Sequence, residues 1–479
     1  MYVHFQGYLM CIYNRKANRM TTNNKAKKDT WTKTRHKIIV PIGMKFLGMY
    51  ARWKYNIDVK PFKEQGNRQY LIMINHQTSF DQFFVGMAVK GPIYFVASED
   101  IFSLGWVSHI IRWVINPVPI KKSVSDMRAV RNCAKIVKEG GTIALAPEGN
   151  RTYSGKQCYM KPGIVAFVKL LKLPVAFFRI EGGYGVQPRW SDVKRKGKMT
   201  GYISRVVEPE EWKQMSDEEI FQMIKDELNV DEARNDKFYY HEKSAEYLDR
   251  AMYVCPDCGL SEFVSAGQYM TCKKCGLKIR YTETTELEGV DKPFPFRYVA
   301  DWYDYQENFI RKLDMETFGD EPIYSDRVRF SEVILYHRKN VLSKDAVFTM
   351  YKDRYEVELT PGNVMKLCFA DISAVSALGK NKLNIYHNDK IYQVKPDKHF
   401  NALKYMNMYY HAANTEKGEE ADVEFLGLKC MGHREPCRRT YRKYADCKHG
   451  QKISAVYEEL SHSYFSSWRA FITYIINYI

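Results

Sequence analysis

A histidine and an aspartate directly follow a short apolar run of this chain. The stretch NHQTSFDQ, residues 75–82, comes directly after the run LIMI and places His76 five positions before Asp81. Histidine suits proton transfer near neutral pH, because its unperturbed pKa is about 6.5. A nearby carboxylate can fix the tautomer of the ring and stabilise the imidazolium that forms. The pair could therefore act as a general base, whereas the alternative is a surface histidine and an aspartate at the start of a helix.

A second group of polar residues ends another apolar run. The stretch TIALAPEGNRTYSGK, residues 142–156, contains Glu148, Gly149 and Arg151 just where the run stops. Gly149 permits a tight turn, and the guanidinium of Arg151 suits a phosphate monoester. Glu148 could accept a hydrogen bond from a substrate hydroxyl or hold the arginine. The alternative is a solvated loop with a local ion pair.

In this order and at this spacing, the two stretches resemble the glycerolipid acyltransferases, specifically the bacterial 1-acyl-sn-glycerol-3-phosphate acyltransferases. The resemblance covers about residues 50–215 and rests on four sequence blocks. The matching positions are Asn75, His76, Ser79 and Asp81 in the first block, Glu148, Gly149 and Arg151 in the third, and Leu173, Pro174 and Val175 in the fourth. Asn150 stands where the family usually has threonine. In the second block, Lys121 and Lys122 stand where the family shows an arginine, and lysine lacks the bidentate fork.

The resemblance implies an enzyme of phospholipid biosynthesis. It would move a fatty acyl group from acyl-CoA or acyl carrier protein to the free hydroxyl of 1-acyl-sn-glycerol-3-phosphate, a lysophospholipid, and so form phosphatidic acid. His76 would deprotonate the hydroxyl, Asp81 would orient His76, and Arg151 with Lys121 would hold the phosphate. The other expected substrate-binding residues are Glu148, Gly149, Asn75 and Ser79. Because the hydroxyl can attack the thioester directly, no cysteine nucleophile is required.

The elements that must position these residues are predicted by alternating apolar and amphipathic stretches. Residues 68–228 are typical of an α/β fold, an acyltransferase-like sheet flanked by helices. The predicted strands span residues 70–74, 93–97, 142–146, 174–180 and 202–207. Helices are predicted over residues 125–141, with Ser125 as the N-cap, and over 216–229, where Ser216 and Glu219 have capping-box spacing.

Four cysteines predict a structural metal site. In CPDCGLSEFVSAGQYMTCKKCG, two C-x-x-C units place Cys255 and Cys258 before Cys272 and Cys275. Two such units converge on one zinc ion, and four sulfur ligands leave no open position for catalysis. A redox dithiol is the alternative. A zinc ribbon also suggests a rival function, a nucleic-acid- or protein-binding module with a non-catalytic α/β scaffold. Nucleic acid is not the expected partner, because residues 253–283 lack a concentrated basic stripe with interleaved aromatics.

The C-terminal half predicts β structure followed by one helix. AVFTMYKDRYEVEL and KLNIYHNDKIYQVKP are typical of hairpins, and DKHFNALKYMNMYYHAA places Phe400, Leu403, Met406 and Tyr410 on one helical face. This pattern suggests a small β-barrel resembling the pleckstrin-homology class, for lipid or partner docking or for a structural role.

Charge is concentrated at the two ends of the 479-residue chain. The formal net charge is +17, with 13 Lys and Arg against 2 Asp and Glu in residues 1–60, and 9 against 4 in residues 429–479. KIIVPIGMKFLGMYARWKY, residues 37–55, is interrupted by Pro41 and Lys45, so it suits lying on an anionic bilayer better than crossing it. The alternative is a first helix packed on its own core. The absence of a signal-peptide pattern favours a reducing compartment, and we expect a peripheral protein on the cytoplasmic face of the membrane.

These observations predict five segments. They are a basic, flexible N-terminus (1–36), an acyltransferase domain that begins with the amphipathic segment (37–235), a zinc ribbon (253–283), a small β-barrel (323–413) and a basic tail (418–479).

Overall fold

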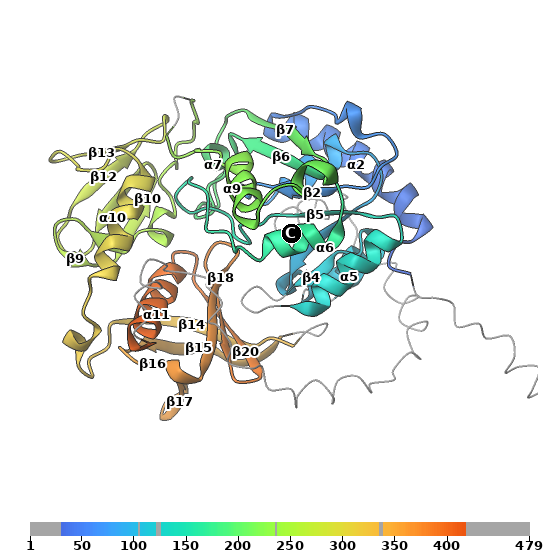
Figure 1. The fold of residues 1–479 in the computed structure, drawn as a ribbon. Coiled ribbons are helices and arrows are strands. Elements are labelled where there is room, and N and C mark those ends of the chain that lie inside the picture. Colours follow the sequence, from blue (N-terminus) through green and yellow to red (C-terminus); the bar gives the residue numbers. More distant parts are fainter. Residues whose placement is uncertain (1–29, 104–105, 121–125, 235–236, 335–338, 418–479) are drawn as a thin grey trace, which may run out of the picture.

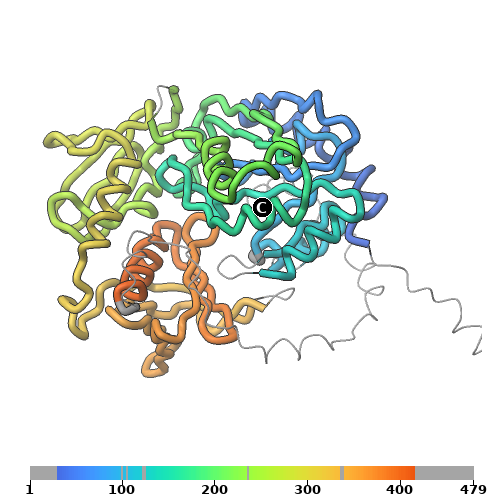
Figure 2. Tube along the Cα trace, in the orientation of Figure 1, coloured from blue at the N-terminus to red at the C-terminus, as the bar shows by residue number. Residues whose placement is uncertain are grey.

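A computed structural model of the chain describes residues 30–103, 106–120, 126–234, 237–334 and 339–417. These residues form three neighbouring parts: a mixed sheet with helices, a small module that contains the paired cysteines, and a curled antiparallel sheet (Figures 1 and 2). Most of the predicted N-terminal segment, the predicted tail, Lys121, Lys122 and Ser125 lie outside the described residues.

The first part is built on a sheet of seven strands in the order β1-β7-β6-β2-β5-β3-β4. The strands are β1 (Ile57–Val59), β2 (Leu71–Ile74), β3 (Ile93–Ser98), β4 (Val118–Ile120), β5 (Thr142–Leu145), β6 (Val175–Glu181) and β7 (Met199–Val207). Strand β2 lies parallel to both β5 and β6, whereas β7 is antiparallel to β6. The five predicted strands are confirmed; the short strands β1 and β4 were not predicted.

Helices cover both faces of this sheet. They are α2 (Thr34–Tyr55), α3 (Asp81–Ala88), α4 (Trp106–Val114), α5 (Met127–Lys138), α6 (Ile164–Leu171), α7 (Gly183–Val186), α8 (Pro209–Trp212) and α9 (Asp217–Leu228). Successive strand residues face opposite sides, so Ile72 and Ile74 pack in one core with residues of α2 and α3, and Leu71 and Met73 pack in another with α5, α6 and α9. The result is a three-layer α/β/α domain, as the sequence predicts.

The two predicted helices begin at different kinds of cap. Ser216 and Glu219 form the expected capping box at the start of α9. At α5 the N-cap is Asp126 rather than Ser125: its side chain accepts hydrogen bonds from the backbone N–H groups of Arg128 and Ala129, at 3.0 and 3.2 Å. Aspartate is as good an N-cap as serine, and the helix begins one residue later than the prediction of Ser125 implies.

The cysteine module is a set of short antiparallel strands followed by a helix. The elements are β8 (Val254–Cys255), β9 (Gly259–Leu260), β10 (Phe263–Ala266), β11 (Tyr269–Cys272), β12 (Lys278–Tyr281), β13 (Leu287–Gly289) and α10 (Val299–Arg311). Helix α10, which was not predicted, packs on the module: Trp302 donates to the carbonyl of Val254 at 2.8 Å, and its ring contacts Phe263 edge to face.

The C-terminal part is a seven-stranded antiparallel sheet in the order β17-β16-β15-β14-β20-β19-β18. Its elements are β14 (Tyr324–Glu332), β15 (Asn340–Met350), β16 (Arg354–Thr360), β17 (Asn363–Cys368), β18 (Ile372–Leu378), β19 (Lys382–His387), β20 (Lys390–Pro396) and α11 (Ala402–Lys417). Both predicted hairpins are present, as β15–β16 and β19–β20. The sheet curls but does not close: β17 and β18 form its two edges among the described strands. We call this part the half-barrel.

Helix α11 is buried on more than the one face that the sequence predicts. Leu403, Met406 and Tyr410 are buried as expected, but Tyr405 and Tyr409 are buried as well. The reason is that the half-barrel, α10 and the cysteine module share one continuous hydrophobic core, to which Trp190 of the first part also belongs. The module and the half-barrel therefore pack as one body against the α/β domain.

Candidate active site

His76 and Asp81 form a close pair between β2 and α3. His76 follows β2 and Asp81 is the first residue of α3, which brings Nδ1 of His76 within 2.6 Å of Oδ2 of Asp81. The same carboxylate accepts backbone N–H bonds from Gln77 and Thr78, both at 2.9 Å, and the hydroxyl of Thr78 at 2.8 Å. An ionised carboxylate accepts on both oxygens and so matches all these contacts. With Nδ1 donating to Asp81, the neutral imidazole carries its lone pair on Nε2, the nitrogen that can take a proton.

The loop after β5 meets the loop after β2. The two strands are parallel neighbours, so their carboxyl ends reach the same edge of the sheet. The backbone N–H of His76 donates to Oε1 of Glu148 at 3.0 Å, and the N–H of Thr152 donates to the carbonyl of His76 at 3.4 Å. Gly149 has a φ of +64°, a conformation that glycine adopts without strain. The structure thus brings the histidine stretch and the PEGNR stretch into one site.

Glu148 joins the two loops through its carboxylate. Its Oε1 accepts from the backbone of His76, and Oε2 accepts from the N–H of Cys158 at 2.7 Å. Burial raises the pKa of Glu148 to about 7, against the opposing effect of the two N–H bonds. Among the described residues, no ion pair links Glu148 to Arg151. Glu148 therefore binds the backbone N–H groups of His76 and Cys158. It does not pair with Arg151, which was one of the two roles predicted for it.

Arg151 is a half-buried cation that lies near Arg189 and Asp81. Its Nη1 is buried and has no hydrogen-bond partner within the described part of the chain. The pKa of Arg151 is lowered to about 10, mainly by burial and to a lesser extent by the positive charge of Arg189. The negative charge of Asp81 opposes this shift. The guanidinium still carries its charge at neutral pH, and a buried charge without a partner favours an anionic ligand.

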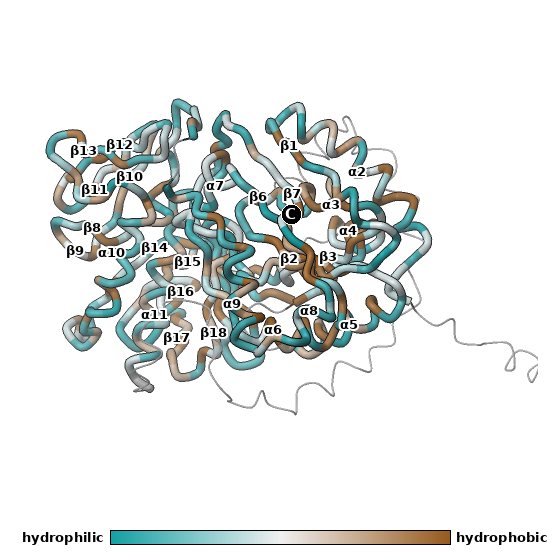
Figure 3. Tube along the Cα trace, turned by 45° about the horizontal axis from the view of Figure 1, so that its top comes forward, coloured by the Kyte–Doolittle hydropathy of each residue, from teal (hydrophilic) through white to brown (hydrophobic). Residues whose placement is uncertain are grey.

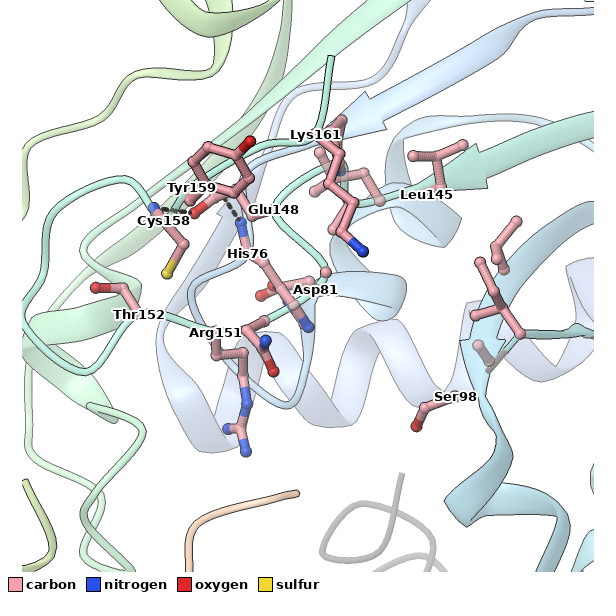
Figure 4. Close-up of a pocket in the computed structure, with 18 of the residues that line it drawn as sticks. His76, Asp81, Ser98, Leu145, Glu148, Arg151, Thr152, Cys158, Tyr159 and Lys161 are labelled. Atoms are coloured by element: carbon pink, nitrogen blue, oxygen red, sulfur yellow. Dashed lines mark hydrogen bonds and ion pairs between the residues drawn. The ribbon is translucent and has the colours of Figure 1, made fainter. Parts of the chain in front are cut away.

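A cavity of about 890 Å³ joins these residues. His76, Asp81, Glu148, Gly149 and Arg151 all line it, and Figure 4 shows the side chains of His76, Asp81 and Arg151 gathered together, with Ser98 and Leu145 farther along the wall. A section of the wall is apolar, formed by Phe95, Ile101, Ile111, Ile115, Ile120 and Phe167. A volume of this size suits a ligand with a long apolar part and a polar end.

Two predicted substrate-binding residues, Asn75 and Ser79, are not among the described residues that line the cavity. Asn75 is buried, and its side-chain amide exchanges two hydrogen bonds with the backbone of Ile180 on β6, at 2.7 and 2.8 Å. The hydroxyl of Ser79 donates to Gln187 at 3.1 Å. Both therefore support the loop on which His76 lies. Lys121 lies outside the described residues.

The two cysteines of the cavity wall are poor nucleophiles. Cys133 lies in α5, and burial raises the pKa of its thiol to about 12. Burial also raises the pKa of Cys158, followed by the negative charge of Glu148. Since the thiolate is the nucleophilic form, neither side chain competes with direct attack by a hydroxyl.

Several residues that complete the cavity belong to no motif recognised in the sequence. Arg189 lies in the loop QPRW, and Tyr303 and Glu307 belong to the unpredicted helix α10. Leu403 and Met406 were predicted only as the buried face of a helix. These positions share no motif, and only the packing of the three parts brings them to the site.

The four predicted metal ligands lie together. The sulfur atoms of Cys255, Cys258, Cys272 and Cys275 are all within 4.8 Å of one another. A tetrahedral zinc ion with Zn–S distances of about 2.3 Å requires sulfur atoms roughly 3.8 Å apart. The pairs Cys255–Cys275 and Cys258–Cys272, at 3.5 and 3.6 Å, meet that requirement closely.

Comparisons with known proteins agree on the first part of the chain. Residues 56–180 match a family model described as Acyltransferase. A 1-acyl-sn-glycerol-3-phosphate acyltransferase of Bacillus subtilis (strain 168) is 20% identical over 161 residues, which span 33% of this chain and 77% of that protein. The crystal structure of the 1-acyl-sn-glycerophosphate (LPA) acyltransferase PlsC from Thermotoga maritima is similar at 25% identity and a TM-score of 0.35, covering 39% of this chain and 76% of that one.

Proposed function

We propose that this chain, which carries a domain of the glycerolipid acyltransferase family, transfers a fatty acyl group from a thioester donor to the free hydroxyl of 1-acyl-sn-glycerol-3-phosphate and so forms phosphatidic acid. The single observation that supports this proposal best is the pairing of His76 with Asp81 beside Arg151 in one cavity. A base and a phosphate-binding cation then face the same acceptor molecule.

His76 acts as the general base. Its Nε2 takes the proton of the acceptor hydroxyl while the hydroxyl oxygen attacks the thioester carbonyl, and Asp81 stabilises the imidazolium. The acyl–sulfur bond then breaks, and the proton held by His76 passes to the departing sulfur. An ester and a free thiol result, with no acyl-enzyme.

Different sections of the cavity wall bind the phosphate and the fatty acyl chain. The acceptor phosphate binds Arg151, whose charge has no counter-ion within bonding distance in the described chain. A fatty acyl chain lies along the apolar section that contains Ile111 and Ile120. Binding both substrates in one cavity supplies the proximity that makes direct transfer possible.

We also propose that α2 binds the surface of an anionic bilayer. Its outer face carries five exposed large apolar side chains, three or four residues apart: Ile38, Ile42, Phe46, Met49 and Trp53. Figure 3 shows hydrophobic segments along α2 and the neighbouring α4, where Trp106 and Trp113 are exposed. No helix in the described part of the chain is long and apolar enough to span a membrane. An exposed apolar ridge flanked by lysine and arginine is typical of a helix that lies in the interface.

The four cysteines hold a structural zinc ion in this proposal. Four thiolates close the coordination sphere, so the ion contributes stability to the module and takes no part in acyl transfer.

The decisive experiment is an acyl-transfer assay. Purified protein is incubated with labelled acyl-CoA or acyl carrier protein and a panel of lysophospholipids and glycerol-3-phosphate, and the lipid products are separated by chromatography. Labelled phosphatidic acid is the expected product. If no acceptor is acylated, and the protein instead shifts DNA or RNA in a gel, the binding-module alternative replaces this proposal.

A further inference from the structure

The C-terminal half-barrel contributes to the cavity that contains His76. Ala377 on β18, with Leu403 and Met406 on α11, lines the same cavity as the catalytic pair, more than 290 residues away along the chain. Figure 2 shows the orange trace of the half-barrel beside the green trace of the first part of the molecule. The acyltransferase match ends at residue 180, so this wall lies outside the matched region.

Arg189 connects the half-barrel to Arg151. Its guanidinium donates to the carbonyls of Ala377 at 2.8 Å and Gly379 at 2.9 Å, and to the backbone carbonyl of Arg151 at 2.9 Å. The same group lies 4.2 Å from the ring centroid of Tyr153. Arg189 is 4% exposed, yet no carboxylate pairs with it in the described part of the chain.

The guanidinium groups of Arg151 and Arg189 therefore line one cavity, and neither makes an ion pair in the described part of the chain. Three of the five N–H groups of Arg189 bond to carbonyls, which leaves two for a ligand. The acidic residues of this wall have other partners: Asp304 pairs with Lys156, and Glu307 with Arg311. Asp81 pairs with His76, and Glu148 accepts two backbone N–H groups. Two adjacent guanidinium groups without a counter-ion are the arrangement that recognises a phosphate monoester.

The turn that holds Arg189 is itself fixed to the α/β domain. The carbonyl of Lys380 accepts from the hydroxyl of Tyr153 at 3.1 Å, and Nζ of Lys380 pairs with Asp192 at 2.7 Å. Gly379 has a φ of +57°, so the turn from β18 to β19 depends on a glycine to present its carbonyl.

From these contacts we propose that Arg189 is a second phosphate-binding residue, and that the turn between β18 and β19 positions it. The proposal rests on the proposed function, since the phosphate is that of the lysophospholipid acceptor. It adds that recognition of the phosphate requires the docked half-barrel, whereas the histidine and aspartate do not.

The test measures binding and does not depend on turnover. In the inactive His76→Ala protein, affinities are determined by calorimetry for lysophosphatidic acid and for a monoacylglycerol of the same chain length. Arg189→Ala should lower the preference for the phosphate-bearing ligand by about tenfold or more, as the loss of a charge-assisted contact predicts. Arg189→Lys, which keeps the charge but not the fork, should lose less of that preference. If Arg189→Ala does not fold, the phosphate preference of Arg189→Lys alone tests whether Arg189 binds the phosphate.

A glycine pair provides the matched control for the turn. Gly379→Val strains the turn beside Arg189, and Gly362→Val imposes the same kind of strain between β16 and β17, where φ is +81° and no atom lies within 4 Å of an added Cβ. Only Gly379→Val should reduce phosphate preference. If folded Arg189→Lys and Arg189→Ala proteins bind both lipids with wild-type preference, Arg189 is only a tether and the proposal is wrong. Failure of the wild-type protein to acylate lysophosphatidic acid would overturn the proposed function separately.

Discussion

The Nδ1 atom of His76 lies 2.6 Å from a carboxylate oxygen of Asp81, and the same carboxylate receives the N–H groups of the two residues that follow the histidine. Asp81 therefore fixes both the ring and the backbone that carries it. This arrangement makes the base rigid before any substrate binds.

Removing the base should abolish most activity without unfolding the protein. We expect His76→Ala to lower kcat by about 10² to 10⁴, the usual contribution of a positioned general base. Steady-state kinetics and thermal unfolding of the same preparation check this. His109→Ala is the matched control, because His109 is an exposed histidine of α4 that is not among the described residues lining the cavity, and activity should remain near wild type. Wild-type turnover of His76→Ala would contradict the mechanism.

Glu148 should make stability decrease as pH rises. Its pKa is raised from 4.5 to about 7 in the folded protein, so between these values the native state holds a proton that the unfolded state has lost. The free energy of unfolding attributable to this group is greatest below pH 4.5 and falls until about pH 7. Glu148→Gln cannot titrate, so its stability relative to wild type should improve from pH 5 to pH 8, as measured by urea unfolding. A constant difference across that range would argue against the raised pKa.

Zinc should support more than the cysteine module. We expect one zinc per chain by elemental analysis and loss of the ion in Cys272→Ser, because structural zinc contributes roughly 10–16 kcal/mol in comparable sites. Trp302 bonds Val254 beside the first ligand, so its fluorescence should shift to longer wavelength when the ion is removed. Cys368→Ser, at an exposed cysteine outside the cluster, should keep the metal. Full zinc content in Cys272→Ser would remove Cys272 from the ligand set.

The exposed face of α2 should control binding to lipid vesicles. Phe46 is 64% exposed, and Phe46→Ser should weaken sedimentation with anionic liposomes by about tenfold or more if the ring is buried in lipid, since burying a phenylalanine is worth about 1.5–3 kcal/mol. Phe238, at 63% exposure beyond α9, provides the control. Equal losses in Phe46→Ser and Phe238→Ser would show that α2 is not the membrane-binding element.

The α/β domain could be predicted because its strands are continuous apolar runs buried on both faces. Leu71 to Ile74 and Thr142 to Leu145 carry this signal in their composition, and the catalytic candidates follow them directly. Short edge strands such as β1 carry too few residues for a pattern. Helix α10 begins at Val299, and its N-cap Tyr298 has no side-chain cap of the usual Ser, Thr, Asp or Asn type. The aromatic-rich stretch before it resembles a linker in sequence.

The site residues from other parts of the chain could not be predicted. Asn75 is part of a motif, yet its amide completes the backbone ladder to Ile180, a role that depends on strand order. Arg189 becomes a candidate only because Ala377 and Gly379 lie beside it. Such contacts arise from tertiary packing between residues far apart in the chain, so no local motif in the sequence marks them.

Helix α11 is enclosed on nearly every side by the half-barrel and α10, and its bonds reach Tyr253 and Leu313 in other elements. During synthesis it is the last described element to emerge. A polypeptide released after residue 401 would already contain the complete His76–Asp81 pair, but the strands flanking the Arg189 turn would lack their cover. The catalytic pair thus precedes α11 in the chain, and the half-barrel wall of the cavity is complete only when α11 has been added.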